Sequence, residues 1–270
     1  MHVNYLYMLK WASSQSQEES KTPCVLDYGC GAGDVVIEAR KCGVNMYGAD
    51  VFYSAAPSYK THAENEGLLN DSIREIKNGI IDFEDGKFDI IVCNQVFEHV
   101  ENLDSTLKEI HRVMSANAKI VCLFPSKDVI REGHLGIPFV HWFSKGSRLR
   151  FYYVYTMRLL GFGYYKLDKS YSEYALSSLN WLDEYTFYRD YEKIIRTFGK
   201  YFKVKRIEDD YVSFRLSKTR MKKLSRILMK LPGAKALSGI VMRKMAGLVL
   251  LAEKVNGAAN LSETNGSERQ

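Results

Sequence analysis

One short stretch of the sequence has the residue types and spacing of a ligand-binding loop. Residues 26–34 read LDYGCGAGD, in which Gly29, Gly31 and Gly33 alternate with small residues. Glycine allows backbone conformations that other residues avoid, and it lets a ligand touch the main chain. The helix expected after the loop also offers free N–H groups at its start. The run therefore predicts a loop that holds a ligand through its backbone.

The identity of that ligand depends on the glycine spacing and on the next expected strand. A dinucleotide site requires G-x-G-x-x-G, but counting from Gly29 the third glycine position holds Asp34. The strand expected at 45–50 ends in Asp50, whose carboxylate could accept both hydroxyls of a ribose. These features favour a nucleoside-containing ligand. Because the third glycine is misplaced, a nicotinamide oxidoreductase ranks behind the two functions given below.

Two histidines further along the chain are candidate bases. His134 follows Gly133 in a loop after the strand expected at 118–125, and His141 lies beside Trp142. Histidine has an ordinary pKa near about 6.5, so it can remove a proton from a hydroxyl at neutral pH. Helix capping or simple packing remains an equally weighted alternative for either residue.

Alternating strands and helices must position these residues. Short apolar runs predict buried parallel strands, and apolar residues at helical spacing predict the helices between them. This alternation implies an α/β, doubly wound, mostly parallel sheet that binds ligands beyond the carboxyl ends of its strands. The expected strands are 24–28, 45–50, 87–95, 118–125 and 247–255; the expected helices are 34–43 and 102–114, with a helix then a strand within 191–208.

Four segments in order resemble the class I S-adenosylmethionine-dependent methyltransferases. They are VLDYGCGAGD, the acid of YGAD, FEDGKFDIIVCNQVFEHV and LKEIHRVMSANAKIVCLFP, within residues 23–126. The resemblance implies a Rossmann-like sheet of seven strands with a helical lid insertion. It also implies S-adenosylmethionine as cofactor and S-adenosylhomocysteine as product.

The resemblance also implies roles for single residues. The glycine loop would lie under the methionine part of the cofactor, with Asp27 orienting the loop and Asp50 holding the ribose. Asn94 with Gln95 would line the opening for methyl transfer, and Asp82 and Phe83 would lie near adenine. Glu98 and His99 recur in this family at a helix start, so catalysis by His99 ranks below catalysis by His134 or His141.

The expected organisation is a single methyltransferase core with insertions. The parts are a cofactor-binding core at 1–126, a lid at 127–180, the rest of the core at 181–256 with a basic helical insert at 213–245, and a disordered tail at 257–270. Cysteines 24, 30, 42, 93 and 122 show no paired zinc-ligand spacing, so reduced thiols and no metal site are expected. The reduced thiols favour a cytoplasmic location, and no signal peptide or membrane span is expected.

The positive charge is confined to one segment. The net charge is +6, yet the stretch between Asp210 and Glu253 holds ten Lys and Arg and no acid, so the remainder carries about −4 (6 minus 10). This distribution argues against a protein-wide nucleic-acid surface, and nucleic acid ranks third among the roles of the basic segment. Apolar residues at helical spacing within 215–245 favour a packed lid, with peripheral contact with an anionic membrane ranked second. The oligomeric state is left open.

The acceptor is expected to be a hydroxyl of a sugar or glycan. EGHLGIPFVHW and the helical insert are similar to bacterial methyltransferases of the surface-polysaccharide type. Basic residues at 131, 145, 148 and 150 could meet a phosphate of such a substrate. A lipid or quinone-like small molecule is the alternative acceptor. A methyltransferase-like protein that binds without catalysing is the alternative of another class.

Overall fold

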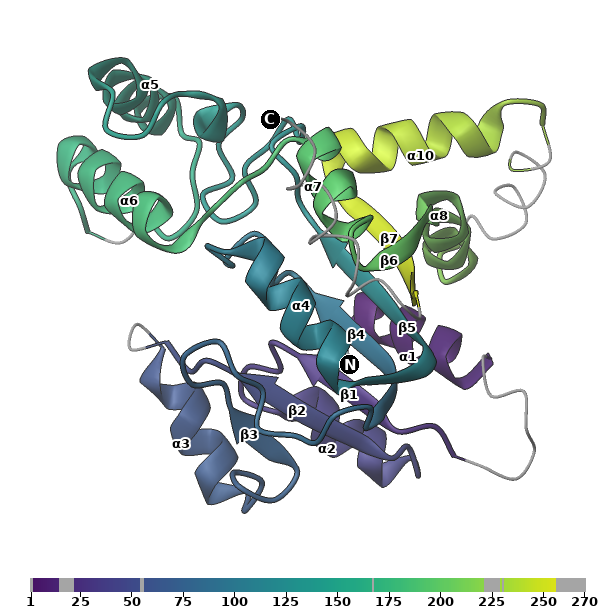
Figure 1. Ribbon diagram of the computed structural model, residues 1–270. Helices are drawn as coiled ribbons and strands as arrows, with labels where there is room; N and C mark the ends of the chain where they lie inside the picture. The colour runs from purple at the N-terminus through teal and green to yellow at the C-terminus, as the bar shows by residue number, and fades with distance from the viewer. Residues whose placement is uncertain are drawn as a thin grey trace, which may run out of the picture.

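A seven-stranded sheet forms the centre of the computed structural model, which describes residues 2–14, 22–53, 56–166, 168–220, 229 and 231–255. The strand order is β3-β2-β1-β4-β5-β7-β6 (Figure 1). The first five strands run parallel, and β7 runs antiparallel to β5 and β6. The doubly wound, mostly parallel sheet expected from the sequence is confirmed. The strands are β1 (Val25–Tyr28), β2 (Met46–Asp50), β3 (Ile73–Glu75), β4 (Phe88–Asn94), β5 (Met114–Phe124), β6 (Phe202–Arg206) and β7 (Leu248–Lys254).

Helices cover both faces of the sheet, and each face has its own hydrophobic core. Helices α4 (Leu103–Val113) and α7 (Tyr191–Phe198) pack on one face. The other face carries α1 (Val3–Ser14), α2 (Asp34–Lys41), α3 (Pro57–Asn65), α8 (Glu208–Ser217) and α10 (Ala234–Met245). Helix α4 shows how apolar residues at helical spacing form one buried face, since all of its apolar residues are buried. Burying one such side chain contributes about 1.5–3 kcal/mol.

The insertion after β5 forms a small body of its own above the sheet (Figure 1). It contains a short helix at Val140–Trp142, then α5 (Arg148–Leu159) and α6 (Tyr171–Tyr185), which pack on each other around a separate cluster of buried residues. Arg150 is buried between the two helices, where it donates to the Val140 carbonyl and pairs with Asp183. We call residues 127–185, which contain this insertion, the lid.

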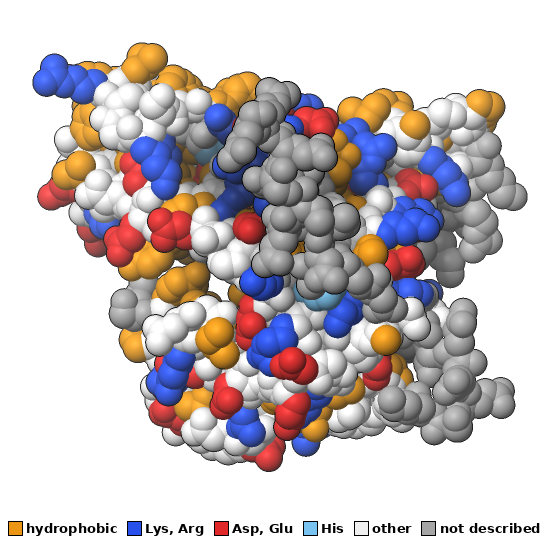
Figure 2. Space-filling view, viewed as in Figure 1, with side chains coloured by type: hydrophobic (Ala, Val, Ile, Leu, Met, Phe, Trp, Pro, Cys, Tyr) orange, Lys and Arg blue, Asp and Glu red, His pale blue; other side chains and the backbone are white. Residues whose placement is uncertain are grey.

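The basic segment packs against the far half of the sheet. Helices α8 and α10 contact each other and β7, and Figure 2 shows Lys and Arg side chains gathered over this part. Residues 221–228 and 230 of the segment, and the tail expected at 257–270, lie outside the described residues. None of the described helices has the length and hydropathy needed to cross a bilayer.

Candidate active site

A cavity of about 420 Å³ opens where β1, β2 and β4 end, with the lid on its other side. This is the position at which doubly wound sheets bind ligands. The sheet side of the cavity is lined by Tyr28, Gly29, Gly31, Asp50, Val51, Ile76, Gln95 and Val96, and the remaining walls by Tyr53, Ala56, Tyr59, His99, Val100, His134, Trp181 and Tyr185.

The glycine loop requires glycine for two separate reasons. Gly29 has a φ of +79°, and a Cβ added there would lie 2.3 Å from Cγ2 of Val96. Gly33 has a φ of +86° at the start of α2, where a Cβ would lie 2.5 Å from Ile73. Left-handed backbone and close approach both exclude larger side chains. The loop therefore presents bare backbone to the cavity, as the sequence predicts.

Asp50 holds this loop in place. One of its carboxylate oxygens accepts a hydrogen bond of 2.8 Å from the Gly31 N–H, and the other accepts one of 2.8 Å from the Phe52 N–H. Asp50 also lines the cavity, where its remaining acceptor capacity is available to a ribose. The contact between a carboxylate and the loop, which the family resemblance assigns to Asp27, is made by Asp50.

Asp27 lies beneath the loop and does not line the cavity. It is fully buried, and neither carboxyl oxygen has a hydrogen-bond partner among the described residues. Burial, and secondarily the nearby charge of Asp50, raise the pKa of Asp27 to about 8. A neutral carboxyl is the form that such an apolar position favours. The expectation that Asp27 orients the loop is therefore corrected.

Asn94 and Gln95 separate at the end of β4. Gln95 lines the cavity, as expected, with its backbone at a φ of +58°. The Asn94 side chain instead accepts a hydrogen bond of 2.8 Å from Asn4 of α1. β4 ends at Asn94, and the left-handed backbone of Gln95 breaks the strand geometry there, so the two side chains point in different directions. The expectation that Asn94 lines the opening is corrected.

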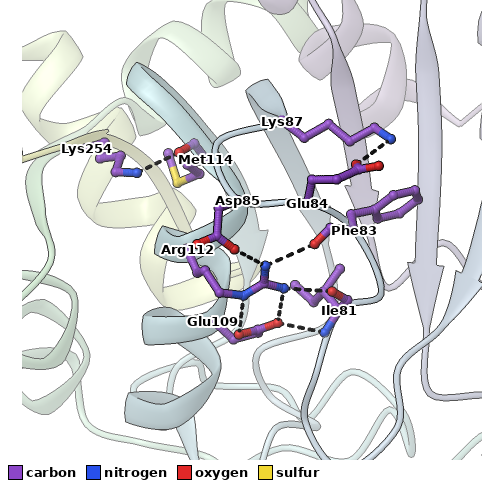
Figure 3. Close-up of polar contacts among 9 residues, drawn as sticks. All are labelled: Ile81, Phe83, Glu84, Asp85, Lys87, Glu109, Arg112, Met114 and Lys254. Carbon is purple, nitrogen blue, oxygen red and sulfur yellow. Dashed lines mark hydrogen bonds and ion pairs between the residues drawn. The ribbon is translucent and has the colours of Figure 1, made fainter.

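The loop that was expected near adenine is fastened to α4 instead. Arg112 donates hydrogen bonds of 2.8 and 3.0 Å to the carbonyls of Ile81 and Phe83, and Glu109 accepts one of 2.8 Å from the Ile81 N–H (Figure 3). The pKa of Glu109 is lowered, chiefly by its hydrogen bond with Arg112. These contacts hold the loop against the core helix.

Asp82 and Phe83 consequently do not line the cavity. Phe83 is buried edge-on against Phe88, with ring centroids 5.0 Å apart. The Asp82 side chain is 82% exposed and lies 3.9 Å from Arg74. Ile76, which directly follows β3, lines the cavity instead. The assignment of Asp82 and Phe83 to the adenine site is therefore corrected.

Two histidines meet at the lid side of the cavity. The Nε2 atoms of His99 and His134 lie 3.2 Å apart, although the residues come from the turn after β4 and from the lid. Trp181 packs beside both rings, at centroid distances of 6.3 and 5.1 Å. His134 lies in the cavity, as the sequence analysis expects. His99, which that analysis ranked low, is its direct neighbour.

Glu132 fixes the orientation of His134. It is fully buried, and it accepts hydrogen bonds from His134 Nδ1 at 2.7 Å and from the Tyr188 hydroxyl and the Leu135 N–H, both at 2.5 Å. Burial alone would raise the pKa of Glu132, but the hydrogen bond and charge of His134, with Tyr188 and Leu135, hold it at about 2. The sequence analysis assigned no role to Glu132, because no motif or residue spacing around it indicates a site.

His99 is held from the other side. Its Nδ1 lies 2.6 Å from the carbonyl oxygen of Tyr185, at the end of α6. Burial, more than the neighbouring His134, lowers the pKa of His99. Beside it, burial and then the charge of Glu132 raise the pKa of Glu98 to about 8.

His141 does not reach the cavity. It is buried in the lid, with its Nε2 3.2 Å from the Lys127 carbonyl and its ring 4.8 Å from that of Tyr188. It therefore packs within the lid, one of the alternatives given for it from the sequence. Its assignment as a candidate base is corrected.

Three of the four basic side chains that were expected to meet a phosphate, those at 131, 145 and 150, bond to backbone carbonyls of the protein instead. Lys145 donates to the carbonyls of Asp183 and Thr186, at 2.6 and 2.9 Å, and Arg131 donates to the Gly136 carbonyl at 3.1 Å. The residues that line the cavity include no Lys or Arg. The cavity walls described thus offer no cation to a phosphate, and that expectation is not supported.

Comparison with known proteins agrees with this architecture. The sequence model of a family described as "Methyltransferase domain" matches residues 4–183, which is about two thirds of the chain. The chain belongs to this methyltransferase family. Its sheet and its motifs are those of the class I S-adenosylmethionine-dependent methyltransferases, and S-adenosylmethionine is its cofactor.

The sequence matches to individual relatives are partial, and each spans less than two thirds of the relative's own length. The methyltransferase is 26% identical over 98 residues to a ubiquinone biosynthesis O-methyltransferase of Maricaulis maris, in a match that takes in 36% of this chain and 39% of that protein. It is 36% identical over 95 residues to a ribosomal protein L11 methyltransferase of Paraburkholderia phytofirmans, over 34% of this chain and 29% of that protein.

A solved structure supports the fold over nearly the whole chain. An S-adenosylmethionine-dependent methyltransferase from Mesorhizobium loti superimposes with a TM-score of 0.52 at 12% identity, covering 94% of this chain and 98% of that one. The resemblance in fold therefore extends over nearly the whole chain.

Proposed function

We propose that the methyltransferase transfers the methyl group of S-adenosylmethionine to a hydroxyl of an uncharged, ring-bearing small molecule. The observation that carries this proposal is the His99–His134 pair, which lines the same cavity as the glycine loop. The acceptor oxygen attacks the methyl carbon while the bond from carbon to sulfur breaks, and the sulfur keeps the electron pair. His134 Nε2 accepts the hydroxyl proton, with Glu132 stabilising the imidazolium.

The cavity favours a flat, quinone-like or phenolic acceptor over the glycan expected from the sequence. Aromatic and aliphatic side chains dominate its lid side, among them Tyr53, Trp181 and Tyr185, and none of the described residues that line it is Lys or Arg. A sugar buried there would need more polar partners for its several hydroxyls. The names of the relatives point to a quinone pathway and to a protein, so the choice between acceptors rests on the cavity.

Methyl-labelled S-adenosylmethionine tests the acceptor class. The purified protein is incubated with matched panels of phenols and hydroquinones and of free and lipid-linked sugars, and label is counted in each product. Label in the phenol or hydroquinone panel is expected. Label in the sugars alone would restore the glycan acceptor. Binding of S-adenosylhomocysteine without label in any panel or in a cell extract would favour the non-catalytic alternative.

Asp50→Ala is expected to weaken S-adenosylhomocysteine binding by about 1–3 kcal/mol, which is about 5–150-fold in dissociation constant. The variant leaves the ribose hydroxyls unpaired and also frees the Gly31 N–H from its carboxylate. Isothermal titration calorimetry measures the change. Asp82→Ala serves as the matched control, because Asp82 is exposed away from the cavity. Equal affinities for the two variants would remove Asp50 from the cofactor site.

Contact with an anionic membrane through residues 215–245 stays a prediction. Helix α10 exposes Leu237, Ile240, Val241 and Met245 beside basic residues, a combination that suits an interfacial helix. Vesicles containing phosphatidylserine are expected to co-sediment the protein at low salt, and a Leu237→Ser/Ile240→Ser double variant is expected to stay in solution. Equal recovery of both proteins in the supernatant would count against membrane contact.

A further inference from the structure

The two histidines at the lid side present their lone pairs to each other. His134 Nδ1 faces Glu132, whose oxygens also accept from the Tyr188 hydroxyl and the Leu135 N–H, and His99 Nδ1 faces the Tyr185 carbonyl oxygen. Each Nδ1 must therefore carry a hydrogen, and in the neutral rings each Nε2 is then an acceptor. Two acceptors 3.2 Å apart repel each other unless a proton on one ring or a metal ion lies between them.

A third group without a partner lies at the same place. Glu98 is 1% exposed, and neither of its carboxyl oxygens has a hydrogen-bond partner among the described residues. A buried carboxyl left unpaired is costly. One oxygen of Glu98 and one nitrogen from each ring all lie within 4.8 Å of one another. The unsatisfied carboxylate and the two facing nitrogens therefore form one converging set of donor atoms.

We propose that Glu98, His99 and His134 bind one divalent metal ion, with zinc as the ion that fits best. Zinc takes imidazole nitrogen at about 2.0–2.1 Å and carboxylate oxygen at about 2.0–2.2 Å in a tetrahedron. Two nitrogens bound in this way stand about 3.3 Å apart, which agrees with the 3.2 Å between the two Nε2 atoms. Small side-chain movements bring the carboxylate to the ion.

The surroundings of the two rings support this assignment. Metal-binding histidines commonly donate their second N–H to a carboxylate or a backbone carbonyl. Glu132 and the Tyr185 carbonyl are acceptors of these two kinds. Both histidines also line the cavity, so the fourth coordination position faces the space for the acceptor. Three protein ligands and one open position are typical of catalytic zinc sites.

The inference deepens the proposed function and rests on it for its role in the reaction. With the ion bound, the two Nε2 atoms are ligands and no longer accept a proton. The acceptor hydroxyl binds at the open position, where the ion lowers its pKa, and its proton leaves with water. Without the ion, His134 alone takes the proton.

Metal binding is tested without reference to activity. Tag-free protein is treated with a chelator, dialysed and titrated with Zn²⁺ by calorimetry, and Co²⁺ is then added to record its visible absorption. One equivalent of Zn²⁺ per chain is expected, with a tetrahedral Co²⁺ spectrum. Glu98→Gln, His99→Gln and His134→Gln are each expected to weaken binding at least about tenfold, and the positioning variant Glu132→Gln by about 10–100-fold.

His111→Gln is the matched control, because His111 lies on α4, where its ring faces the Val255 carbonyl and not His99 or His134. It is expected to bind Zn²⁺ like the wild type, and thermal unfolding confirms that each variant is folded. No Zn²⁺ binding by the wild type, or equal binding by all folded variants, overturns the metal site. Methyl transfer by metal-free protein at the full rate would overturn the role of the ion while leaving the proposed function intact. Zn²⁺ binding without any methyl transfer would overturn the proposed function while leaving the metal site intact.

Discussion

The His134→Gln protein is expected to bind S-adenosylhomocysteine like the wild type and to transfer methyl groups about 10²–10⁴-fold more slowly. His134 contacts Glu132, Tyr188 and His99 but neither the glycine loop nor Asp50. The cofactor half of the cavity is therefore left intact. Removing the ring takes away the group that receives the proton or holds the ion. Single-turnover rates with a saturating acceptor measure the loss.

A second histidine of the lid provides the comparison for His134. His141 is buried behind the cavity and is bonded to the Lys127 carbonyl. We expect His141→Gln to lower thermal stability while changing the single-turnover rate less than about tenfold, since it removes no group from the cavity. Equal rates for the His134 and His141 variants would show that the lid as a whole, and not the cavity histidine, limits the reaction.

Gly29→Ala is expected to lower the free energy of unfolding by about 2–5 kcal/mol. About 1–2 kcal/mol comes from placing a Cβ on left-handed backbone, and about 1–3 kcal/mol from overpacking against Val96, whose Cγ2 would lie 2.3 Å away. Urea denaturation gives the free energy, and calorimetry gives the accompanying loss of cofactor affinity.

The chain contains a matched control for this effect. Gly43 has the same φ of +79°, but a Cβ there would meet no described atom within 4 Å. Gly43→Ala is therefore expected to cost only the backbone part, about 1–2 kcal/mol. The difference between the two losses in free energy of unfolding gives the part that is due to the close approach of the loop to Val96. If both variants lost the same stability, the glycine at 29 would be needed only for its backbone conformation.

Local pattern was enough to predict most of the sheet. β1, β2, β4 and β7 fall within a residue or two of the expected strands, because each is a buried apolar run between turn residues. β3 was not predicted, since its three residues are too few to show a period. β5 begins at Met114, four residues earlier than expected, because 114–117 extends beside β4 with a shifted register.

The two halves of the site differ in how much the sequence reveals. The glycines and Asp50 follow their strands directly, so local spacing predicts where they meet. His99 and His134 are brought together only when the lid folds over β4, and Glu132 and Tyr185 become their partners in the same event. The direction of a side chain at the end of a strand, such as Asn94, can be predicted only when the register of the strand is known.

The position of β7 bears on how the protein is made. β7 follows β6 in the chain but lies between β5 and β6, and β6 at the edge of the sheet pairs with β7. A nascent chain that has emerged only as far as α10 can assemble the parallel strands, but it leaves one edge of β5 unpaired and β6 without a partner strand. Such edges attract strands from other chains. Translation that stops shortly before residue 247 is thus expected to yield an aggregating protein, although every residue that lines the cavity has already been synthesised.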